Sequence, residues 1–233
     1  MRLDFTDQHV VITGGTGALG SAVVERLVEC GAVCHVPCRQ ELDLERFRFR
    51  DHPQVKIAIG VELSDEEAVG ALYASVNGLW ASINIAGGHA MAPIVETSLA
   101  AFRHMIDTNA VTCFLCCREA VRRLRASRKG GRIVNVAAKP ALHPAGGRIA
   151  YAASKAAVVA ITLGLAEEVA VDGIWVNAVV PSIMDTPANR QASPGADYAK
   201  WPKVEEVAAT MVFLASPQNA VSRGALVPVY GRS

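Results

Sequence analysis

The sequence carries almost no net charge and has no long run of charge of one sign. Its 233 residues hold 23 Lys and Arg against 22 Asp and Glu, a net charge of +1. A surface for nucleic acid or for an anionic membrane would need an excess of positive charge, so we expect neither partner. Apolar stretches end before the roughly 18 residues that a membrane helix needs, and the N-terminus lacks the apolar segment of a secretion signal. We therefore expect a cytoplasmic protein.

The cysteines lack the spacing of a disulfide framework or of a metal site. Cys113-x-x-Cys116 lies in a helical run, and no second ligand pair follows it. We therefore expect no metal and interpret the cysteines as small buried apolar side chains. The six cysteines of the sequence are Cys30, Cys34, Cys38, Cys113, Cys116 and Cys117.

The chain also lacks linkers, internal repeats and low-complexity tracts, and its length suits one large core. Short β-branched runs alternate with amphipathic helical patterns, which favours a parallel sheet with helices on both faces. We predict a single α/β domain over residues 1–233, a doubly wound, Rossmann-like sheet of seven parallel strands. Gly31 and Gly173 are interpreted as helix stop signals. The expected strands are 10–13, 33–38, 55–61, 81–86, 132–137, 174–180 and 225–229; the expected helices are 19–30, 65–76, 99–124, 151–171 and 204–214.

A glycine-rich segment, residues 13–20, lies between the first predicted strand and the first predicted helix. Glycines there let backbone N–H groups approach phosphate oxygens, and the helix directs its positive end to the same place. Gly15-x-Gly17-x-x-Gly20 thus matches a dinucleotide fingerprint in position as well as in letters. The alternative is a tight strand-to-helix turn without a ligand. The residues expected to hold the pyrophosphate are Gly14, Gly15, Gly17, Ala18, Leu19 and Gly20.

Tyr151-x-x-x-Lys155 places a phenol and an ammonium one turn apart on the same face of a predicted helix. At about 4 Å and an effective dielectric near 20, the ammonium would contribute roughly 4 kcal/mol, or about three pKa units. We therefore expect Lys155 to pull the pKa of Tyr151 toward neutrality, so that the phenol can transfer a proton. The alternative is an ordinary amphipathic helix surface.

These motifs together resemble the short-chain dehydrogenase/reductase family, from residue 9 to about residue 230. The resemblance implies that Tyr151 is the catalytic acid and that Lys155 also holds the nicotinamide ribose. It also implies that Asn109 supports a water-linked proton relay. Further segments that resemble the family are expected to contact the cofactor through Asn84, Ala86 and Gly87, and through Pro181, Ile183 and Thr186 near the nicotinamide.

The chain departs from the family pattern at two positions. Ala18 stands where the usual turn has glycine, and Ala138 stands at the position of the catalytic serine, thirteen residues before Tyr151. Removing one donor to a developing oxyanion typically costs a factor of about 10²–10³ in turnover. An ordinary ketone reductase should not tolerate that loss.

Both departures occur together in one branch of the family, the dihydropteridine reductases, which this sequence resembles. The turn at residues 14–21, the pair Ala138-Lys139, the run Ala86-Gly87-Gly88 and the segments 185–190 and 194–201 carry this likeness. It implies reduction of quinonoid dihydropterin, an electrophilic ring that needs little help from a serine. The alternatives are reduction of another activated carbonyl or imine, or a low-activity nucleotide-binding sensor.

Cofactor preference is expected to depend on the end of the second strand, where an acidic residue would bind the adenosine ribose. Cys38 stands there, and Arg39 could pair with a 2′-phosphate. We therefore predict NADP as the cofactor, with NAD as the alternative because Asp43 lies close in sequence, as does Glu45. Glu62 and Leu63 follow the third strand, where the adenine would lie.

We expect a small-molecule substrate under a lid formed by residues 182–202. Tyr198 and Trp201 could stack on a planar ring or anchor the lid. The resemblance also implies a homo-oligomer, dimer or tetramer, formed through the helices that begin near Leu99 and Tyr151. The other residues expected to line the substrate pocket are His89 and Lys139, with His143 as a weaker candidate.

Overall fold

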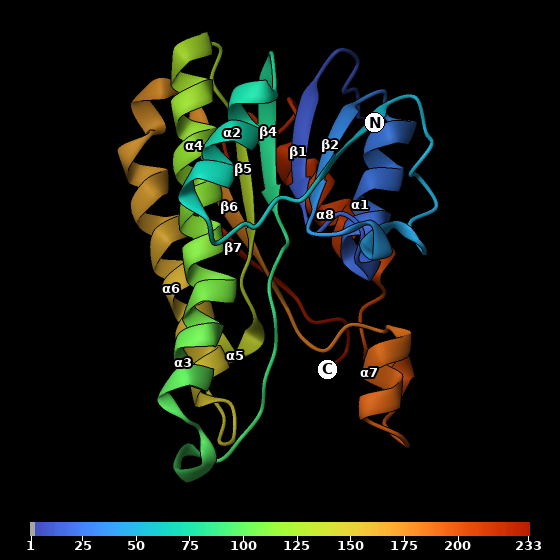
Figure 1. Ribbon diagram of the computed structural model, residues 1–233, viewed down its shortest axis with the longest axis vertical. Helices are drawn as coiled ribbons and strands as arrows, with labels where there is room; N and C mark the ends of the chain where they lie inside the picture. The colour runs from blue at the N-terminus through green and yellow to red at the C-terminus, as the bar shows by residue number, and fades with distance from the viewer. Residues whose placement is uncertain (1–2) are drawn as a thin grey trace.

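The computed structural model describes residues 3–233, and their seven strands form one wholly parallel sheet. The strand order is β3-β2-β1-β4-β5-β6-β7, so the winding reverses between β1 and β4 (Figure 1). The predicted doubly wound α/β fold is confirmed, and each strand begins and ends within two residues of its predicted bounds. The strands are β1 (His9–Thr13), β2 (Val33–Cys38), β3 (Val55–Ile59), β4 (Leu79–Asn84), β5 (Gly131–Val136), β6 (Ile174–Pro181) and β7 (Leu226–Val229).

Two layers of helices cover the sheet, because alternate residues of each strand face opposite sides. Val10 and Ile12 join the core beneath α1 and α8, whereas Val11 joins the core beneath α2, α4 and α6. Figure 1 shows these two groups on opposite faces. The helices are α1 (Ala18–Glu29), α2 (Glu66–Ser75), α4 (Thr112–Ser127), α6 (Ile149–Glu168) and α8 (Val204–Ala215).

The long helix predicted over 99–124 is interrupted. It consists of α3 (Leu99–Met105), a π-helical turn (Ile106–Val111) and α4. Such turns insert an extra residue into a helix and often occur at functional sites. Asn109 lies in this one.

Helix α6 is long and apolar enough, by length and composition alone, to cross a membrane. In its most apolar 18-residue stretch, 39% of the residues are buried. The expectation that no such stretch exists was therefore wrong. Within the described residues, α6 packs against β5, β6 and α4. Its buried face belongs to the core, and the opposite face includes the exposed Ile149 and Leu163. Such a helix reads as continuously apolar although only one side meets the sheet.

The loops beyond the carboxyl ends of β4, β5 and β6 extend below the sheet (Figure 1). They include two short helices that the sequence did not predict, α5 (Lys139–Leu142) and α7 (Pro187–Ala192). Helix α7 begins where Thr186 Oγ1 accepts a hydrogen bond from the N–H of Asn189 at 3.2 Å, and Pro187 follows at its first position.

Candidate active site

The glycine-rich turn joins β1 to α1 through contacts that leave little room for side chains. The N–H of Gly17 donates to the carbonyl of Gly14 at 3.1 Å, and Gly14 has a φ of +67°. A Cβ on Gly20 would lie 2.0 Å from the Gly14 carbonyl oxygen. Helix α1 begins with no side-chain cap and no acidic residue in its first turn. Its first N–H groups are therefore open to an anion.

The segment after β4 lies against this turn. Thr13 Oγ1 accepts hydrogen bonds from the N–H groups of Ile85 at 3.1 Å and Ala86 at 3.2 Å. The side chain of Asn84 is instead buried in the core, where its amide donates to Asn135 Oδ1 at 2.8 Å. Asn84 thus supports the segment from within the sheet, while Gly87 lines the cavity described below.

Asn109 holds the chain after Gly87 in place. Its Oδ1 accepts from the N–H of Gly88 at 3.0 Å, and its Nδ2 lies within hydrogen-bond distance of the Gly88 carbonyl, 3.0 Å, and of Ser154 Oγ, 3.1 Å. The side chain is 1% exposed. Asn109 therefore ties the loop after β4 to helix α6.

Tyr151 and Lys155 lie one turn apart on α6, as the spacing predicted. Both line a single cavity, together with Ala138 at the end of β5. Lys155 is buried, and its Nζ donates to the carbonyl of Val136 at 2.8 Å. Burial lowers the pKa of Lys155 to about 8.

The expected effect of Lys155 on Tyr151 is wrong for this structure. Burial raises the pKa of Tyr151 to about 12, and the cation that opposes this shift is Arg148. The ammonium of Lys155 is directed to the Val136 carbonyl, and the desolvation of the phenol dominates. At neutral pH Tyr151 is therefore a protonated phenol, suited to donate a proton.

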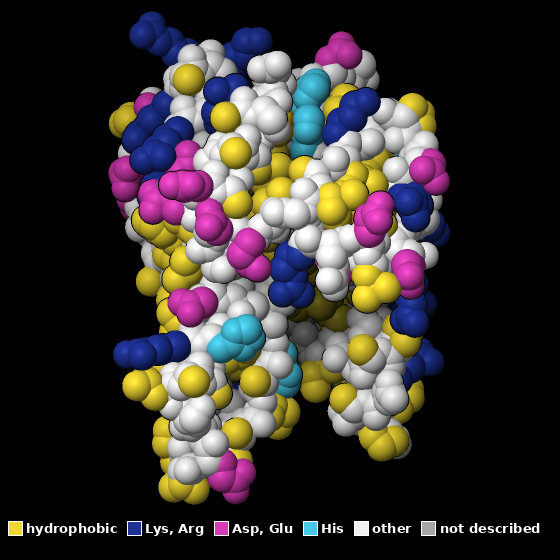
Figure 2. Space-filling model, viewed as in Figure 1, with side chains coloured by type: hydrophobic (Ala, Val, Ile, Leu, Met, Phe, Trp, Pro, Cys, Tyr) yellow, Lys and Arg dark blue, Asp and Glu magenta, His cyan; other side chains and the backbone are white. Residues whose placement is uncertain are grey.

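The cavity measures about 680 Å³ and opens between the carboxyl edge of the sheet and α7. Figure 2 shows the surface hollowed at this place. Ala138 presents no hydroxyl to it. The neighbouring Lys139 does not fill that role, because its Nζ donates to the carbonyl of Ser233 at 3.3 Å and lies 4.9 Å from the ring centre of Tyr230.

The predicted substrate residues divide into two groups. His89, Lys139, His143 and Trp201 line the cavity, whereas Tyr198 is not part of its wall. The Tyr198 hydroxyl donates to the carbonyl of Ser193 at 3.1 Å, and its ring lies 5.0 Å from that of Trp201. Tyr198 therefore anchors the segment 182–202, and Trp201 reaches the cavity.

Comparison with known proteins shows which family has this fold and site. Residues 8–197 match the family model for short chain dehydrogenase. Galactitol 2-dehydrogenase from Rhizobium johnstonii is 35% identical over 98% of this chain and 95% of its own length. Cis-4-hydroxycyclohexanecarboxylate dehydrogenase from Sinomonas cyclohexanicum is 29% identical over 97% of this chain and 96% of its own.

The chain belongs to the short-chain dehydrogenase/reductase family. A solved short chain dehydrogenase/reductase family protein superimposes with a TM-score of 0.89 at 26% identity, covering 99% of this chain and 98% of the other. ElxO with NADP bound shares the fold, with a TM-score of 0.87 at 23% identity, and the match covers 96% of this chain and 97% of ElxO. The chain is thus an oxidoreductase of a family that uses NAD or NADP.

The residues of the turn fit such a dinucleotide. A Cβ on Gly17 would meet only the Gly14 carbonyl oxygen, at 3.4 Å, so the face of the turn at Gly17 is otherwise open. That open backbone and the uncapped start of α1 form a cradle of suitable chemistry for a pyrophosphate. Ala18, at the first position of α1, is exposed.

At the end of β2, the sequence did not reveal how close a carboxylate lies. Asp43 Oδ2 accepts hydrogen bonds from the N–H groups of Arg39 and Gln40, each at 3.2 Å. Burial, and then the charge of Asp43, raises the pKa of the Cys38 thiol. A short 3₁₀ helix (Glu41–Leu44) thus returns an acidic side chain to the strand end where the sequence has none. Arg39 is exposed beside it.

After β3, Glu62 and Leu63 divide between loop and core. Glu62 Oε1 accepts from the N–H and the hydroxyl of Ser64 at 3.1 and 2.9 Å. Leu63 packs against the core beneath α2 and α4. Glu62 thus shapes the loop where an adenine is expected.

After β6, the predicted nicotinamide contacts separate. Pro181 and Ile183 line the cavity. Thr186 lies in a neighbouring shallow pocket and caps α7 through its hydroxyl.

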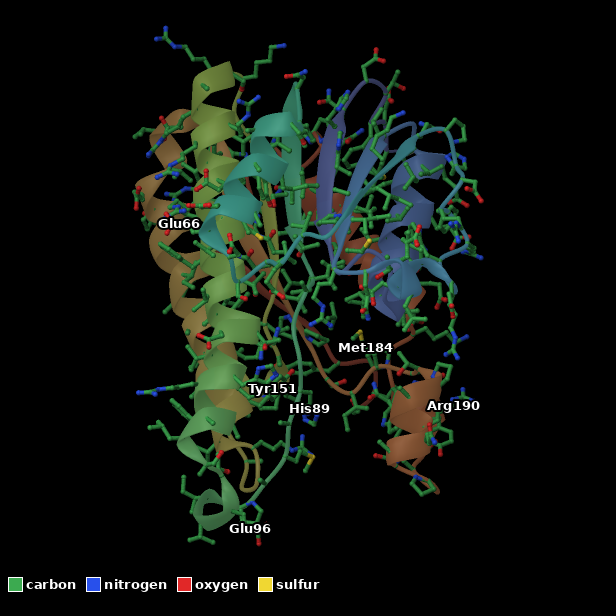
Figure 3. All side chains as sticks on the ribbon, in the orientation of Figure 1. Glu66, His89, Glu96, Tyr151, Met184 and Arg190 are labelled. Carbon is green, nitrogen blue, oxygen red and sulfur yellow. The ribbon has the colours of Figure 1, made fainter. Side chains whose placement is uncertain are left out.

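Sequence reasoning missed many of the residues that line the cavity, among them Arg148, Met184 and Asn189. Figure 3 shows His89 and Tyr151 together on one side and Met184 near α7. Arg148 had one usable signal, its position three residues before Tyr151. Met184 and Asn189 had none, because the path of residues 182–202 follows no periodic pattern.

Proposed function

We propose that this oxidoreductase is an NADPH-preferring reductase of a small conjugated ring substrate, with quinonoid dihydropterin as the first candidate. The observation that carries the proposal is the pairing of a protonated Tyr151 with an alanine at position 138 in one cavity. The cavity retains a proton donor but lacks the hydroxyl that would bind a localised oxyanion.

Tyr151 is the catalytic acid in this proposal. Its phenol, with a pKa of about 12, stays protonated at neutral pH and can protonate the more basic anion that hydride addition leaves on a substrate. The bound reduced nicotinamide supplies the hydride. Lys155 binds the nicotinamide ribose, and Asn109 supports proton supply by holding the loop at Gly88 beside Ser154.

Ala138 favours an acceptor that is already electrophilic. In a conjugated imine or quinonoid ring, the added electron pair spreads over several atoms, so one missing donor matters less than in a simple ketone. The likeness to the dihydropteridine reductase branch, carried by residues 14–21 and by Ala138-Lys139, supports quinonoid dihydropterin as that acceptor.

The cofactor contacts follow the same proposal. The turn from Gly14 to Gly20 holds the pyrophosphate, and Glu62 with Leu63 lies beside the adenine. Arg39 is exposed at the end of β2, where its planar fork can pair with a 2′-phosphate. Asp43 opposes that preference, because its carboxylate occupies two N–H groups at the same place. Ala86 and Gly87, with Pro181, Ile183 and Thr186, contact the nicotinamide half.

Residues 182–202 form the substrate lid in this proposal. Trp201 stacks on the ring of the substrate, and Tyr198 holds Trp201 in place through the carbonyl of Ser193. His89 and Lys139 complete the substrate wall. A cytoplasmic location and a homo-oligomer, dimer or tetramer, stay predictions from the sequence.

A second candidate is interconversion of a cyclic alcohol and its ketone. It is favoured by the names of two relatives, cis-4-hydroxycyclohexanecarboxylate dehydrogenase and 2,3-dihydroxy-2,3-dihydro-p-cumate dehydrogenase, each 29% identical over nearly the whole chain. Both of those enzymes act on substituted six-membered rings, which a cavity of about 680 Å³ can hold.

The test is a set of turnover assays with NADPH and with NADH. The acceptors are quinonoid dihydropterin, 4-oxocyclohexanecarboxylate and a panel of simple ketones. We expect quinonoid dihydropterin to be reduced fastest and Tyr151→Phe to lower that rate by about 10²-fold or more, with cofactor binding retained. If the cofactor binds and Tyr151→Phe changes no rate, the catalytic role of Tyr151 is wrong. Cofactor binding without turnover of any acceptor would instead favour a nucleotide sensor.

A further inference from the structure

Several basic side chains line the cavity, and no acidic side chain among the described residues does. Three cations line it, Lys139, Arg148 and Lys155, together with the imidazoles of His89 and His143. In a cleft with walls of one sign, the field favours ligands of the opposite sign. The charge of the cavity therefore constrains the substrate independently of its ring system.

Two of the three cations already have partners within the protein. Lys155 donates to the carbonyl of Val136 at 2.8 Å, and Lys139 donates to the carbonyl of Ser233 at 3.3 Å. Arg148 is half-buried, and in residues 3–233 no hydrogen bond, ion pair or ring contact engages its side chain. A partly desolvated guanidinium with five free donors is suited to a ligand that can accept two of them at once.

The position of Arg148 directs that ligand to the reacting group. Arg148 is the N-cap residue of α6, Tyr151 follows three residues later, and both line the cavity. The first turn of α6 contains no acidic residue, so the positive end of the helix dipole is also unopposed there. The ring of His89 packs edge-on against that of Tyr151.

The charge of Arg148 affects the pKa values of Tyr151 and His89. Burial raises the pKa of Tyr151, and the positive charge of Arg148 opposes that rise. Burial lowers the pKa of His89, and Arg148 lowers it further. The positive charge of Arg148 thus acts on both residues.

We propose that Arg148 binds a carboxylate of the substrate through its planar fork. The substrate would then be a small ring compound with an anionic group a few bonds from the atom that Tyr151 protonates. The reaction assigned to such a substrate rests on the proposed function; the anion site itself does not. Quinonoid dihydropterin has no such group, so this anion site fits the second candidate function, in which a substituted six-membered ring is the substrate, better than the first.

The experiment measures ligand binding without turnover. Benzoate and benzamide, which have the same ring and nearly the same shape, are titrated calorimetrically into the protein saturated with oxidised cofactor. We expect the wild-type protein to bind benzoate at least about tenfold more tightly than benzamide, the ratio that one charge-assisted pair provides. Arg148→Gln should abolish that ratio, and Arg148→Lys should keep part of it.

The matched control is Arg26→Gln. Arg26 is also half-buried, and its substitution removes the same charge. It lies in the last turn of α1 and does not line the cavity. It should keep the benzoate preference, and both Gln variants should keep their melting temperature and cofactor affinity. Equal affinities for the two probes, no binding of benzoate, or a preference that survives Arg148→Gln would each overturn the proposal.

Failure of the anion site and failure of the reductase give different results. A protein that prefers benzoate through Arg148 yet reduces no acceptor keeps the anion site and loses the proposed function. A protein that reduces quinonoid dihydropterin with no Arg148-dependent preference for benzoate does the reverse.

Discussion

The ring of His89 stands edge-on to the ring of Tyr151, with centroids 4.7 Å apart and an angle of 79° between the planes. The two residues come from different elements, the loop after β4 and helix α6. Figure 3 shows them side by side. An edge-to-face pair of this kind contributes about 0.5–1.5 kcal/mol beyond area burial, so His89 restrains the phenol that we assign as the proton donor.

His89 is therefore expected to act on turnover through the position of Tyr151. His89→Ala should lower kcat by about two- to tenfold, the range that the ring pair provides. His89→Phe should recover most of that loss, because it restores an aromatic edge without a titratable group. Steady-state kinetics with the best acceptor gives both values. A His89→Phe variant as slow as His89→Ala would show that the imidazole itself takes part.

Ala138 offers a gain-of-function test. Ala138→Ser places a hydroxyl at the end of β5, in the cavity that contains Tyr151. It should raise kcat/KM for simple ketones by up to about 10²-fold and change reduction of a conjugated acceptor little. Ala145→Ser, on the same cavity wall, is the control. Equal gains for both acceptor classes would contradict the explanation given for the alanine.

Cofactor preference depends on two opposed charges at the end of β2. Asp43→Asn removes a negative charge but keeps an oxygen that can accept from the N–H groups of Arg39 and Gln40. It should tighten NADPH binding by about tenfold relative to NADH, the effect of one partly screened charge. Arg39→Gln should weaken NADPH binding and spare NADH. Fluorescence titration of the reduced cofactors measures both, and an unchanged NADPH/NADH ratio in both variants would refute this account.

Two glycine-to-alanine changes should have opposite effects on stability. A Cβ on Gly20 would lie 2.0 Å from the Gly14 carbonyl oxygen, so Gly20→Ala should distort the turn, lower the melting temperature and abolish cofactor binding. Gly70 lies inside α2 with nothing within 4 Å of its added Cβ. Gly70→Ala should stabilise the fold by about 0.5–1 kcal/mol. Thermal unfolding compares the two, and a harmless Gly20→Ala would contradict the turn geometry.

Acid should destabilise the fold through His35. Its ring nitrogen lies 2.9 Å from that of His9, and burial, then the charges of His9 and Lys56, lower the pKa of His35 to about 4. The unfolded chain, with a pKa near 6.5, binds a proton that the folded chain excludes, so stability falls as the pH drops from about 6.5 to 4.

The loss attributable to His35 is at most about 2–3 kcal/mol, because the ring is only partly buried. His35→Gln keeps a hydrogen-bonding side chain and removes the titration. Urea unfolding at a series of pH values should show a shallower dependence in the variant across that window. Parallel curves for the two proteins would rule out this role.

Much of the fold was predictable because it depends on local periodicity. Strand β2 begins and ends at its predicted residues, and α8 differs by one residue. The predicted helix over 99–124 failed, since Asn109 lies in a π-helical turn whose side chain binds Gly88, a contact that no local pattern encodes. Helices α5 and α7 depend likewise on the loops that they join.

At the site, spacing placed Tyr151 and Lys155 on one face of α6 but did not predict their charge states. The pKa of each depends on burial and on the direction of the Lys155 side chain toward Val136. Asp43 was noted beside Arg39, but its return to the strand end depends on the 3₁₀ helix that follows β2.

The amino-acid sequence by itself determined the family, the order of the strands' patterns and the helical register of the proton donor, because these depend on residue spacing along the chain. The tertiary structure alone decided which charges meet. It placed the phenol in a half-buried position, turned the ammonium of Lys155 to a carbonyl, brought Asp43 beside Arg39 and left Arg148 without a counter-ion in the cavity. Desolvation and Coulomb energies depend on distances through space. Those distances join residues that are far apart in the sequence, so only the folded chain determines them.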